Sequence, residues 1–437
     1  MIASIWRALR LQAGALWERA KGDSDMSKIR AFRAYRPRPE LSARVASFPY
    51  DVINSDEARA LAQGNPYTFL HVGKPEIDLD PSVPLYDDRV YAMGRDNLRR
   101  LITEGILLHD DKPYLYIYQQ KMGDHVQAGL VCLCSVKEYE GDLIKKHEFT
   151  RKDKEDDRTR HVADQNANAE PVFLTYQARK DIDQIVDWVR AEKPLYDIVT
   201  EDGIGHTVWR VDNDEWRSHL ETLFAQVPAL YVADGHHRTA AAVRTGQALR
   251  QKSATHTGEE PFEYFMAVVF PHDQLQIMDY NRVVKDLNGL SRNGFVDKVV
   301  ERFKVKIADS PKPKAPRHFG MFLEGHWYEL EAREGTYPAD DPVKGLDVSI
   351  LQDNLLSPIL GIADPRTDKR IDFVGGIRGT KELEKRVGEG WAVAFSLFPT
   401  SLDQLMAVAD SGQVMPPKST WFEPKLRSGL LVRLIEE

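Results

Sequence analysis

An apolar run in the middle of the chain leads directly into five residues whose side chains bind and move charge. The run is residues 231–233, and the five that follow are Asp234, Gly235, His236, His237 and Arg238. Gly235 tolerates positive φ and the close approach of a ligand, and the helix-forming residues 239–244 come next. A helix that starts here presents unpaired backbone N–H groups to an anion, and its dipole, Arg238 and the histidines add positive potential. The pattern predicts a phosphate site.

Two other interpretations of these residues stay open. The first is an ordinary strand-to-helix turn in which Asp234 caps the helix and both histidines lie on the surface. The second is a zinc site at His236 and His237. Adjacent histidines point in different directions, however, and the sequence has neither an H-E-x-x-H nor a paired C-x-x-C motif. The density of polar types directly after a buried strand favours the phosphate site.

Residues 234–238 resemble the nucleotide-binding turn of the ParB/sulfiredoxin superfamily, in which a strand ends in a Gly-x-x-Arg type motif and a helix follows. Sulfiredoxins have Gly-Cys-His-Arg at this point, and free serine kinases have Asp-Gly-His-Thr-Arg or a close variant. This chain has Gly235-His236-His237-Arg238, with histidine where the sulfur chemistry needs cysteine. The resemblance implies a nucleotide-binding turn without the sulfiredoxin reaction.

Five separated segments are similar, in sequence and in order, to a bacterial and archaeal domain-of-unknown-function family, number ten-fifteen. They are residues 49–53 (PYDVI), 145–150 (KKHEFT), 234–238 (DGHHR), 281–284 (NRVV) and 415–422 (MPPKSTWF). On these segments the chain is identified as a member of that family from Met26 onward. By kinship with the ParB-like serine kinases, the resemblance implies a kinase of free L-serine or a similar metabolite.

Residues 145–161 are the most charged segment of the chain. Four of its cations are candidates for neutralising phosphate charge: Lys145, Lys146, Arg158 and Arg160. His147 or Glu148 is able to move a proton. A solvated helix or a surface loop has the same composition, and this alternative stays open.

Residues 415–422 offer a second set of phosphate or carboxylate ligands. Two prolines fix the backbone ahead of Lys418, Ser419 and Thr420, and Lys425 follows. The alternative is a C-terminal lid that packs Trp421 and Phe422 into the core, and both interpretations are compatible.

These residues suggest a mechanism of phosphoryl transfer. Gly235, His236, His237 and Arg238 would hold the phosphates of ATP or ADP, helped by Lys146, Arg158, Lys418 and Ser419. Asp51, Glu148, Asp234 and His237 are the candidates for proton transfer, and the carboxylates also for coordination of the Mg²⁺ that accompanies the nucleotide. The rival functions are a ParB-like nucleotide-dependent DNA-binding or regulatory protein, a metal-dependent hydrolase that uses His147, Glu148, His236 and His237, and a scaffold without catalysis.

The pattern of elements predicts an α+β (mixed α/β) fold. The resemblance implies a ParB/sulfiredoxin-like core, with an additional mixed sheet and helices. We expect an N-terminal extension over residues 1–25, a catalytic region over 26–290 and a C-terminal α+β region over 291–437. Helices are expected over 86–104, 182–189, 214–224 and 380–387, and another should open with Ser55 as its cap. Strands are expected over 114–119, 127–136, 229–233, 265–270 and 371–376.

The composition is that of a soluble globular protein of 437 residues, with a formal net charge of −8. This charge argues against an extended nucleic-acid contact, because phosphate-backbone binding normally shows as an excess of Lys and Arg. Cys132 and Cys134 are too few for a disulfide framework, and no apolar run is long enough to cross a membrane. We therefore expect a cytoplasmic protein, acting as a homodimer, whose partners are a nucleotide and a small acceptor.

Overall fold

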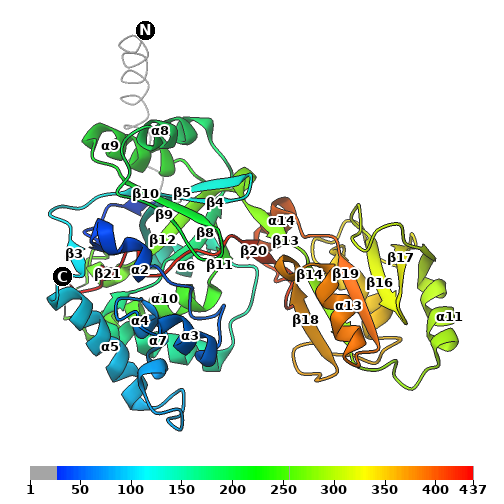
Figure 1. Ribbon diagram of the computed structural model, residues 1–437. Helices are drawn as coiled ribbons and strands as arrows, with labels where there is room; N and C mark the ends of the chain where they lie inside the picture. The colour runs from blue at the N-terminus through cyan, green and yellow to red at the C-terminus, as the bar shows by residue number, and fades with distance from the viewer. Residues whose placement is uncertain (1–26, 255, 437) are drawn as a thin grey trace. The chain divides into compact units, whose positions relative to one another are not determined.

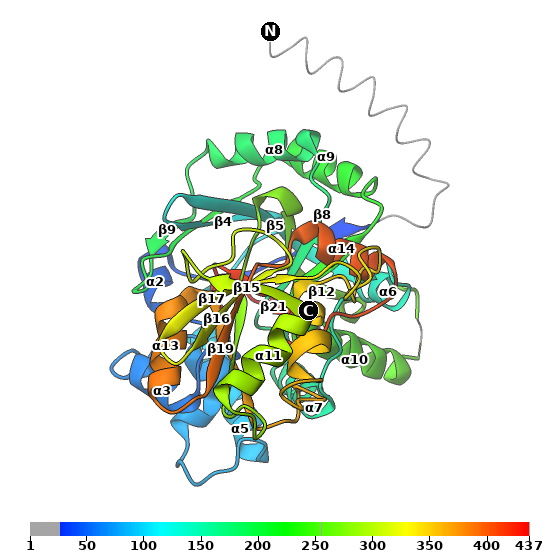
Figure 2. The same cartoon turned by 90° about the vertical axis from the view of Figure 1, so that its right-hand side faces the viewer.

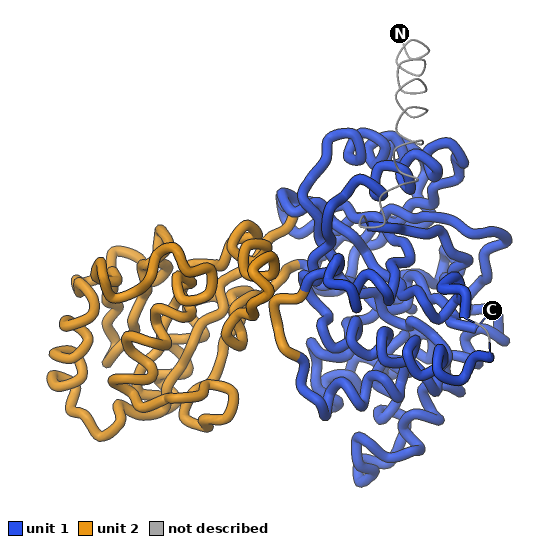
Figure 3. Tube along the Cα trace, turned by 180° about the vertical axis from the view of Figure 1, so that it is seen from behind, with its two compact units in different colours: residues 1–145, 150–274, 424–437 blue, residues 146–149, 275–423 orange. Residues whose placement is uncertain are grey.

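The computed structural model describes residues 27–254 and 256–436. The predicted N-terminal extension, residues 1–25, lies outside the described residues. Two compact units divide the chain (Figure 3): unit 1 takes the described part of Met1–Lys145 together with Thr150–Gln274 and Pro424–Glu437, and unit 2 takes Lys146–Phe149 and Leu275–Glu423. The chain passes between the two units after residues 145, 149, 274 and 423. The boundary expected between residues 290 and 291 stays a prediction.

Unit 1 is built on a mixed sheet. In the described residues this sheet has nine strands in the order β6-β11-β8-β12-β5-β4-β10-β9, with β1 paired to β5. The strands of unit 1 are β1 (Ile29–Arg30), β2 (Tyr35–Pro37), β3 (Leu107–His109), β4 (Tyr116–Met122), β5 (His125–Ser135), β6 (Ile144–Lys145), β7 (Ala167–Asn168), β8 (Val172–Tyr176), β9 (Tyr196–Val199), β10 (Gly205–Arg210), β11 (Leu230–Asp234), β12 (Tyr264–Pro271) and β21 (Arg433–Leu434).

Helices cover both faces of this sheet. They are α2 (Ser42–Val45), α3 (Ser55–Ala62), α4 (Leu70–Gly73), α5 (Asp88–Thr103), α6 (Val136–Glu140), α7 (Lys152–Gln165), α8 (Lys180–Arg190), α9 (Asp214–Phe224) and α10 (His236–Lys252). Figure 1 shows α8 and α9 on one face and α5, α7 and α10 on the other. Ile182 of α8 and Leu220 of α9 join one apolar cluster with Leu174 of β8, which buries the sheet between its helical layers.

The strand that leads to the candidate site is buried and irregular at its end. β11 pairs in parallel with β6 and antiparallel with β8, and the register with β8 shifts between Val232 and Asp234. Such a bulge redirects the side chain that follows it. Asp234, paired with Phe173 beyond this shift, is the last residue of β11 before the chain turns into α10.

Most of the predicted elements of unit 1 are confirmed. Strands β4 and β5 form the expected hairpin, with Met122 opposite His125. The expected helices correspond to α5, α8 and α9, and the segment 145–161 contributes most of α7. One cap is wrong: Asn54, rather than Ser55, caps α3, and its side chain accepts hydrogen bonds from the backbone N–H groups of Asp56 and Glu57. The fold class is confirmed as mixed α/β.

Unit 2 contains its own sheet, with the strand order β15-β17-β16-β19-β14-β18. The strands of unit 2 are β13 (Gln276–Met278), β14 (Tyr280–Val284), β15 (Phe303–Ile307), β16 (His318–Leu323), β17 (His326–Ala332), β18 (Ile371–Gly375), β19 (Val393–Leu397) and β20 (Trp421–Glu423), of which β13 and β20 pair with each other outside this sheet. The helices of unit 2 are α11 (Arg292–Arg302), α12 (Asp347–Leu351), α13 (Thr380–Gly388) and α14 (Leu402–Asp410). Figure 2 turns this unit toward the viewer, with α13 lying against the sheet at β14, β16 and β19. The predicted strand 371–376 and helix 380–387 are confirmed as β18 and α13.

Two further expectations can be compared with the structure. No helix among residues 27–254 and 256–436 has the length and apolar character that a membrane span requires. Cys132 and Cys134 are both buried and free, with their Sγ atoms 3.9 Å apart on one face of β5.

Candidate active site

The turn between β11 and α10 has the geometry that its sequence predicts. Gly235 lies in the left-handed region with φ 84°, directly before the first residue of α10. A Cβ atom on Gly235 would lie 3.0 Å from both Cζ and Nε of Arg238. Glycine is therefore favoured by the backbone conformation and by the guanidinium that folds back over the turn.

The cap of α10 tests one of the alternative interpretations of this turn. No side chain of the described residues caps this helix, so the alternative in which Asp234 is its cap is wrong. The N–H of Thr239 donates to the carbonyl of Gly235 at 2.9 Å, as in an ordinary i to i−4 helix bond. The first N–H groups of a helix have no intrahelical acceptor, and they point along the helix axis, where they are able to bind an anion.

Arg238 is buried beside this helix end, with 7% of its surface exposed. Its Nη1 donates to the carbonyl of Pro171 at 2.7 Å, and its Nη2 lies 3.8 Å from a carboxylate oxygen of Asp51 and 3.8 Å from one of Asp234. Burial works against the charge, but the two carboxylates prevail and raise the pKa of Arg238. Its buried Nε has no hydrogen-bond partner in the described part of the chain, and an unsatisfied donor of this kind points to a ligand or a bound water.

Asp234 is shared between two cations. Lys425 Nζ lies 3.2 Å from Asp234 Oδ2, in addition to the contact with Arg238. Burial alone would raise the pKa of the Asp234 carboxyl, but the charges of Lys425 and Arg238 lower it below its ordinary value. Asp234 is therefore ionised at neutral pH.

The two histidines of the turn have different surroundings. His236 is buried in the first turn of α10, with 5% of its surface exposed. His237 is half-buried, and its Nε2 accepts a hydrogen bond from the backbone N–H of Arg151 at 3.0 Å. Burial lowers the pKa of His237. An acceptor role for Nε2 and a lowered pKa both indicate a neutral ring with its proton on Nδ1.

Arg158 lies on α7, in the interior of unit 1. Its Nε and Nη2 donate to Asp157 Oδ2 at 2.9 and 2.7 Å, and its guanidinium stacks 4.1 Å from the ring centre of Tyr50. With Arg238 and Glu170 it lines a cavity of about 40 Å³, which is large enough to hold water. Arg158 therefore shares a cavity with Arg238, while its guanidinium is paired with Asp157.

Glu170 is a half-buried carboxylate that the sequence analysis does not select. Its Oε1 accepts hydrogen bonds from the backbone N–H of Tyr50 at 3.3 Å and from Ser428 Oγ at 3.0 Å. Burial raises the pKa of Glu170, although Arg238 and Arg158 oppose this rise. Its only sequence signal is a position shortly after the charged segment 145–161.

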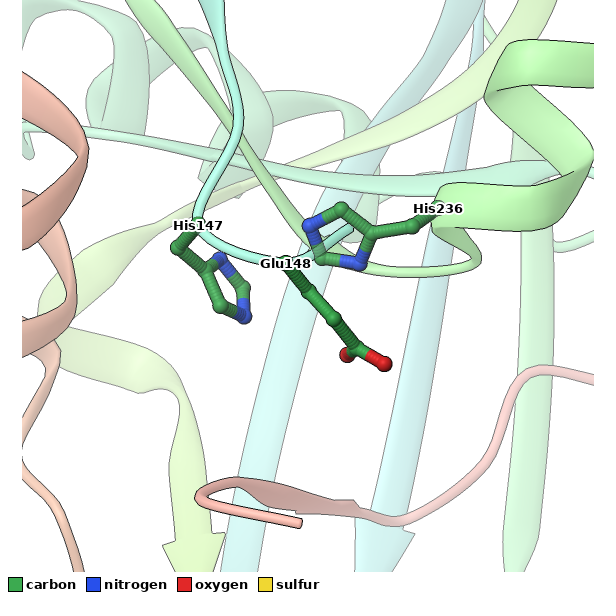
Figure 4. Close-up of side chains that lie close together, drawn as sticks. All are labelled: His147, Glu148 and His236. Carbon is green, nitrogen blue, oxygen red and sulfur yellow. The ribbon is translucent and has the colours of Figure 1, made fainter. Parts of the chain in front are cut away.

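Two predicted residues, Lys146 and Glu148, lie in unit 2. Lys146 is half-buried and Glu148 is exposed, while His147 between them is buried and its carbonyl accepts from the N–H of Met415 at 2.8 Å. Figure 4 shows His147 and Glu148, which come from the segment Lys146–Phe149, and His236, which comes from the start of α10. The first two belong to unit 2 and the third to unit 1.

Lys418 and Ser419 also lie in unit 2. Lys418 is exposed and has φ 58°, with its Nζ 5.5 Å from the ring centre of Tyr280. Ser419 is buried, and its hydroxyl donates to the carbonyl of Pro416 at 2.6 Å. Of the two aromatic residues that the lid interpretation packs into the core, Phe422 is buried and Trp421 is half-buried. The serine hydroxyl therefore holds the segment together internally.

The structure thus brings together part of the predicted set. Asp51, Asp234, Gly235 and Arg238 meet at one turn of unit 1, with His236 and His237 on the first turn of α10 and Arg158 behind. Lys425 joins them, although the sequence had grouped it with residues 415–422. Lys146, Glu148, Lys418 and Ser419 belong to the other unit.

A family model described as "Protein of unknown function (DUF1015)" matches residues 29–349. No curated protein matches the chain. Among solved structures, a free serine kinase in complex with AMP is similar with a TM-score of 0.35 and 13% sequence identity, covering 69% of this chain and 91% of that one. A conserved hypothetical protein from Pyrococcus furiosus has a TM-score of 0.34 and 13% identity, covering 70% and 95%, and SbnI with a C-terminal truncation from Staphylococcus aureus has 0.35 and 13%, covering 70% and 87%.

Proposed function

Because the chain belongs to the DUF1015 family, whose description assigns no reaction, we propose its function from the geometry of unit 1: it is a small-molecule kinase. It would transfer a phosphoryl group from ATP or ADP to the hydroxyl of free L-serine or a similar metabolite. The observation that carries this proposal is the turn at Gly235, where Arg238 lies buried against an uncapped helix N-terminus with an unsatisfied Nε donor.

The donor phosphates would bind at this turn. Backbone N–H groups at the start of α10 and the dipole of this 17-residue helix favour negative charge there. Arg238 adds a fixed guanidinium, whose donors match phosphate oxygens in spacing and plane. Phosphoryl transfer depends mainly on such positioning and charge stabilisation, because the protein contributes little covalent chemistry.

Asp51 and Asp234 are the carboxylates of this proposal. Both contact the same Nη2 of Arg238, so they flank the position assigned to the phosphates. Carboxylate oxygens are the donors that Mg²⁺ prefers, and both residues fit the ion that accompanies a nucleotide. Mg²⁺ would neutralise phosphate charge. The more exposed Asp51 is our choice for the base that accepts the proton of the acceptor hydroxyl, since Asp234 is occupied by two cations.

Free L-serine is proposed as the acceptor because residues 234–238 resemble the turn of free serine kinases. The same resemblance leads us to place unit 1 with the ParB/sulfiredoxin-like proteins. His237 has a neutral ring tied to Arg151, so we assign it to holding α7 against α10 rather than to catalysis. Lys146, Glu148, Lys418 and Ser419 remain predicted contributors to phosphate binding and proton transfer.

The test is an assay for phosphoserine by mass spectrometry, with purified protein, Mg²⁺, L-serine and either ATP or ADP. We expect phosphoserine from the wild type and a loss of at least about 100-fold in Arg238→Lys, which keeps the charge and loses the planar fork. The matched control is Arg250→Lys, at the other end of α10, where the arginine pairs with Glu140 and Glu263. A wild type that binds neither nucleotide and makes no phosphorylated product would refute the proposal.

A further inference from the structure

The segment Pro424–Glu437 belongs to unit 1, although it follows the whole of unit 2 in the chain and lies beyond the residues that the family model matches. Its first residues pass the candidate site and leave two side chains there. Lys425 Nζ lies 3.2 Å from Asp234 Oδ2, and Ser428 Oγ donates to Glu170 Oε1 at 3.0 Å. The segment therefore supplies part of the site from the far end of the sequence.

Two buried side chains of β4 fix the backbone of this segment. Gln120 Nε2 donates to the carbonyl of Lys425 at 2.8 Å, and the backbone N–H of Arg427 donates to the hydroxyl of Tyr118 at 3.1 Å. Gln120 is fully buried and Tyr118 nearly so. These bonds set the register of the segment at Lys425 and at Arg427, so Lys425 starts from a fixed Cα position.

The side chain of Arg427 is fixed by hydrogen bonds and by a stacked aromatic ring. Its Nε donates to His206 Nε2 at 3.3 Å, and its Nη2 donates to Thr200 Oγ1 at 3.1 Å and to Asp202. The guanidinium also stacks 3.7 Å from the ring centre of Phe48. Arg427 is 4% exposed, so it serves the interior and is not itself available to a ligand.

The tautomer of His206 determines which groups of this hydrogen-bond network donate and which accept. Arg427 Nε carries a hydrogen, so His206 Nε2 must accept, and the proton of the imidazole lies on Nδ1, which donates to the Tyr118 hydroxyl at 2.8 Å. Burial lowers the pKa of His206 to about 3, which favours a neutral ring at neutral pH. The Tyr118 hydroxyl oxygen thus accepts one hydrogen bond from His206 and one from the backbone N–H of Arg427. These two bonds fix the positions of the His206 ring and of the Arg427 backbone.

We infer that Lys425 is a phosphate-binding cation of the unit 1 site and that Arg427 is the residue that positions it. This inference rests on the proposed function for the identity of the anion, a nucleoside di- or triphosphate. Asp234 is the last residue of β11, so a cation 3.2 Å from its carboxylate lies at the Gly235 turn. The Lys425 side chain is only 14% exposed, and it shares Asp234 with Arg238, so an arriving phosphate meets two cations already placed side by side.

The first experiment measures acylation of individual lysines in the full chain by an amine-reactive acetylating reagent, followed by mass spectrometry. We expect saturating ADP with Mg²⁺, or inorganic tripolyphosphate alone, to slow the labelling of Lys425 at least about tenfold. The exposed Lys252 at the end of α10 is the internal control and should not respond. Unchanged labelling of Lys425 at saturation, or no binding of either probe by calorimetry, overturns the inference.

The second experiment separates positioning from stability. We expect Lys425→Met and Arg427→Met each to weaken the binding of ADP at least about tenfold, and the double variant to lose little more, because both remove the same contact. Arg427→Met should also change the labelling rate of Lys425 in the free protein, whereas Lys425→Arg should retain binding. The control Arg433→Met removes another buried arginine of the same segment, which donates to Asn168 and to backbone carbonyls, and it should lower stability without affecting either readout. If Arg427→Met behaves like Arg433→Met, the positioning role is wrong.

These results are distinguishable from a failure of the proposed function. Protection of Lys425 by tripolyphosphate or ADP without any phosphoserine would keep the inference and remove the kinase activity. Phosphoserine formed by Lys425→Met with unchanged kcat and KM would keep the kinase and overturn the inference.

Discussion

Lys425 and Asp234 are 191 positions apart in the chain and meet in unit 1 with Nζ 3.2 Å from Oδ2. Asp234 also lies 3.8 Å from Arg238, so one carboxylate joins the last segment of the chain to the first turn of α10. The side chains of Lys425 and Asp234 are 14% and 28% exposed, which makes this a partly desolvated pair rather than a surface contact.

This pair should show measurable coupling in stability. In a double-mutant cycle of Asp234→Asn and Lys425→Met, we expect a coupling free energy of about 1–2 kcal/mol, more than an exposed pair gives. The measurement is chemical denaturation followed by hydrogen exchange in β11 and β12, so that the signal reports unit 1. Additive single and double variants would show that the two charges do not interact.

Gly235→Ala tests the turn itself. An alanine in the left-handed region costs about 1–2 kcal/mol, and at Gly235 its Cβ would also press on the Arg238 guanidinium, adding about 1–3 kcal/mol. Gly258 is a matched control, because it has the same φ of 84° but nothing within 4 Å of its Cβ position. We expect Gly235→Ala to lower the free energy of unfolding more than Gly258→Ala does, and equal losses would mean that the guanidinium moves aside without cost.

The local geometry of the turn from Asp234 to Arg238 could be predicted from the sequence. Asp234 to Arg238 are contiguous, and the apolar strand, the glycine and the helix-forming residues around them each favour the observed turn through short-range physics. Periodicity likewise located α5, α8 and α9. Local signals are sufficient where one turn brings the residues together.

The contacts between residues that are far apart in the sequence could not be predicted from it. Glu170 meets Ser428 and the backbone of Tyr50 only because β8, the C-terminal segment and the loop before α3 converge in unit 1, and no spacing in the sequence encodes that convergence. Lys425 was grouped with Lys418 and Ser419 because they are neighbours in sequence, yet the two groups belong to different units. Proximity along the chain is a poor guide where the chain leaves one unit and returns to it.

The contact between α7 and α10 should weaken in acid. Burial lowers the pKa of His237 below its ordinary value of 6.5, so the unfolded or detached state binds the proton more tightly than the folded one. The contribution of neutral His237 to the free energy of unfolding is therefore fully present above pH 6.5, and it is lost as the pH falls below that value. The hydrogen bond from the Arg151 N–H to Nε2 is the interaction at risk.

We expect several-fold faster amide exchange over the first turn of α7 at pH 5 than at pH 7, after correction for intrinsic rates. His237→Gln keeps an acceptor without a titrating ring, so its protection should change less with pH. The same pH dependence in both proteins would place the effect in other groups.

Glu138 should make unit 1 less stable as the pH rises toward and above neutrality. Its Oε1 accepts from the backbone N–H of Lys28 at 2.8 Å, while its buried Oε2 has no hydrogen-bond partner among the residues that the structure describes. Burial raises the pKa of this carboxyl from 4.5 to about 7, so the folded state binds the proton more tightly than the unfolded one. Stability from this group is present below pH 4.5 and is lost as the pH rises through about 7, by an amount on the order of 3 kcal/mol.

Glu138→Gln removes the titration and should flatten this loss between pH 5 and pH 8, measured as global hydrogen-exchange protection in β5 and β12. Asp347→Asn is the matched control in unit 2, since burial raises the pKa of Asp347 to about 7 as well. It should flatten the pH dependence of protection in β16 and β19 and leave that of β5 and β12 as in the wild type. A Glu138→Gln protein that loses protection in β5 and β12 as steeply as the wild type would show that this carboxyl is not the group that titrates.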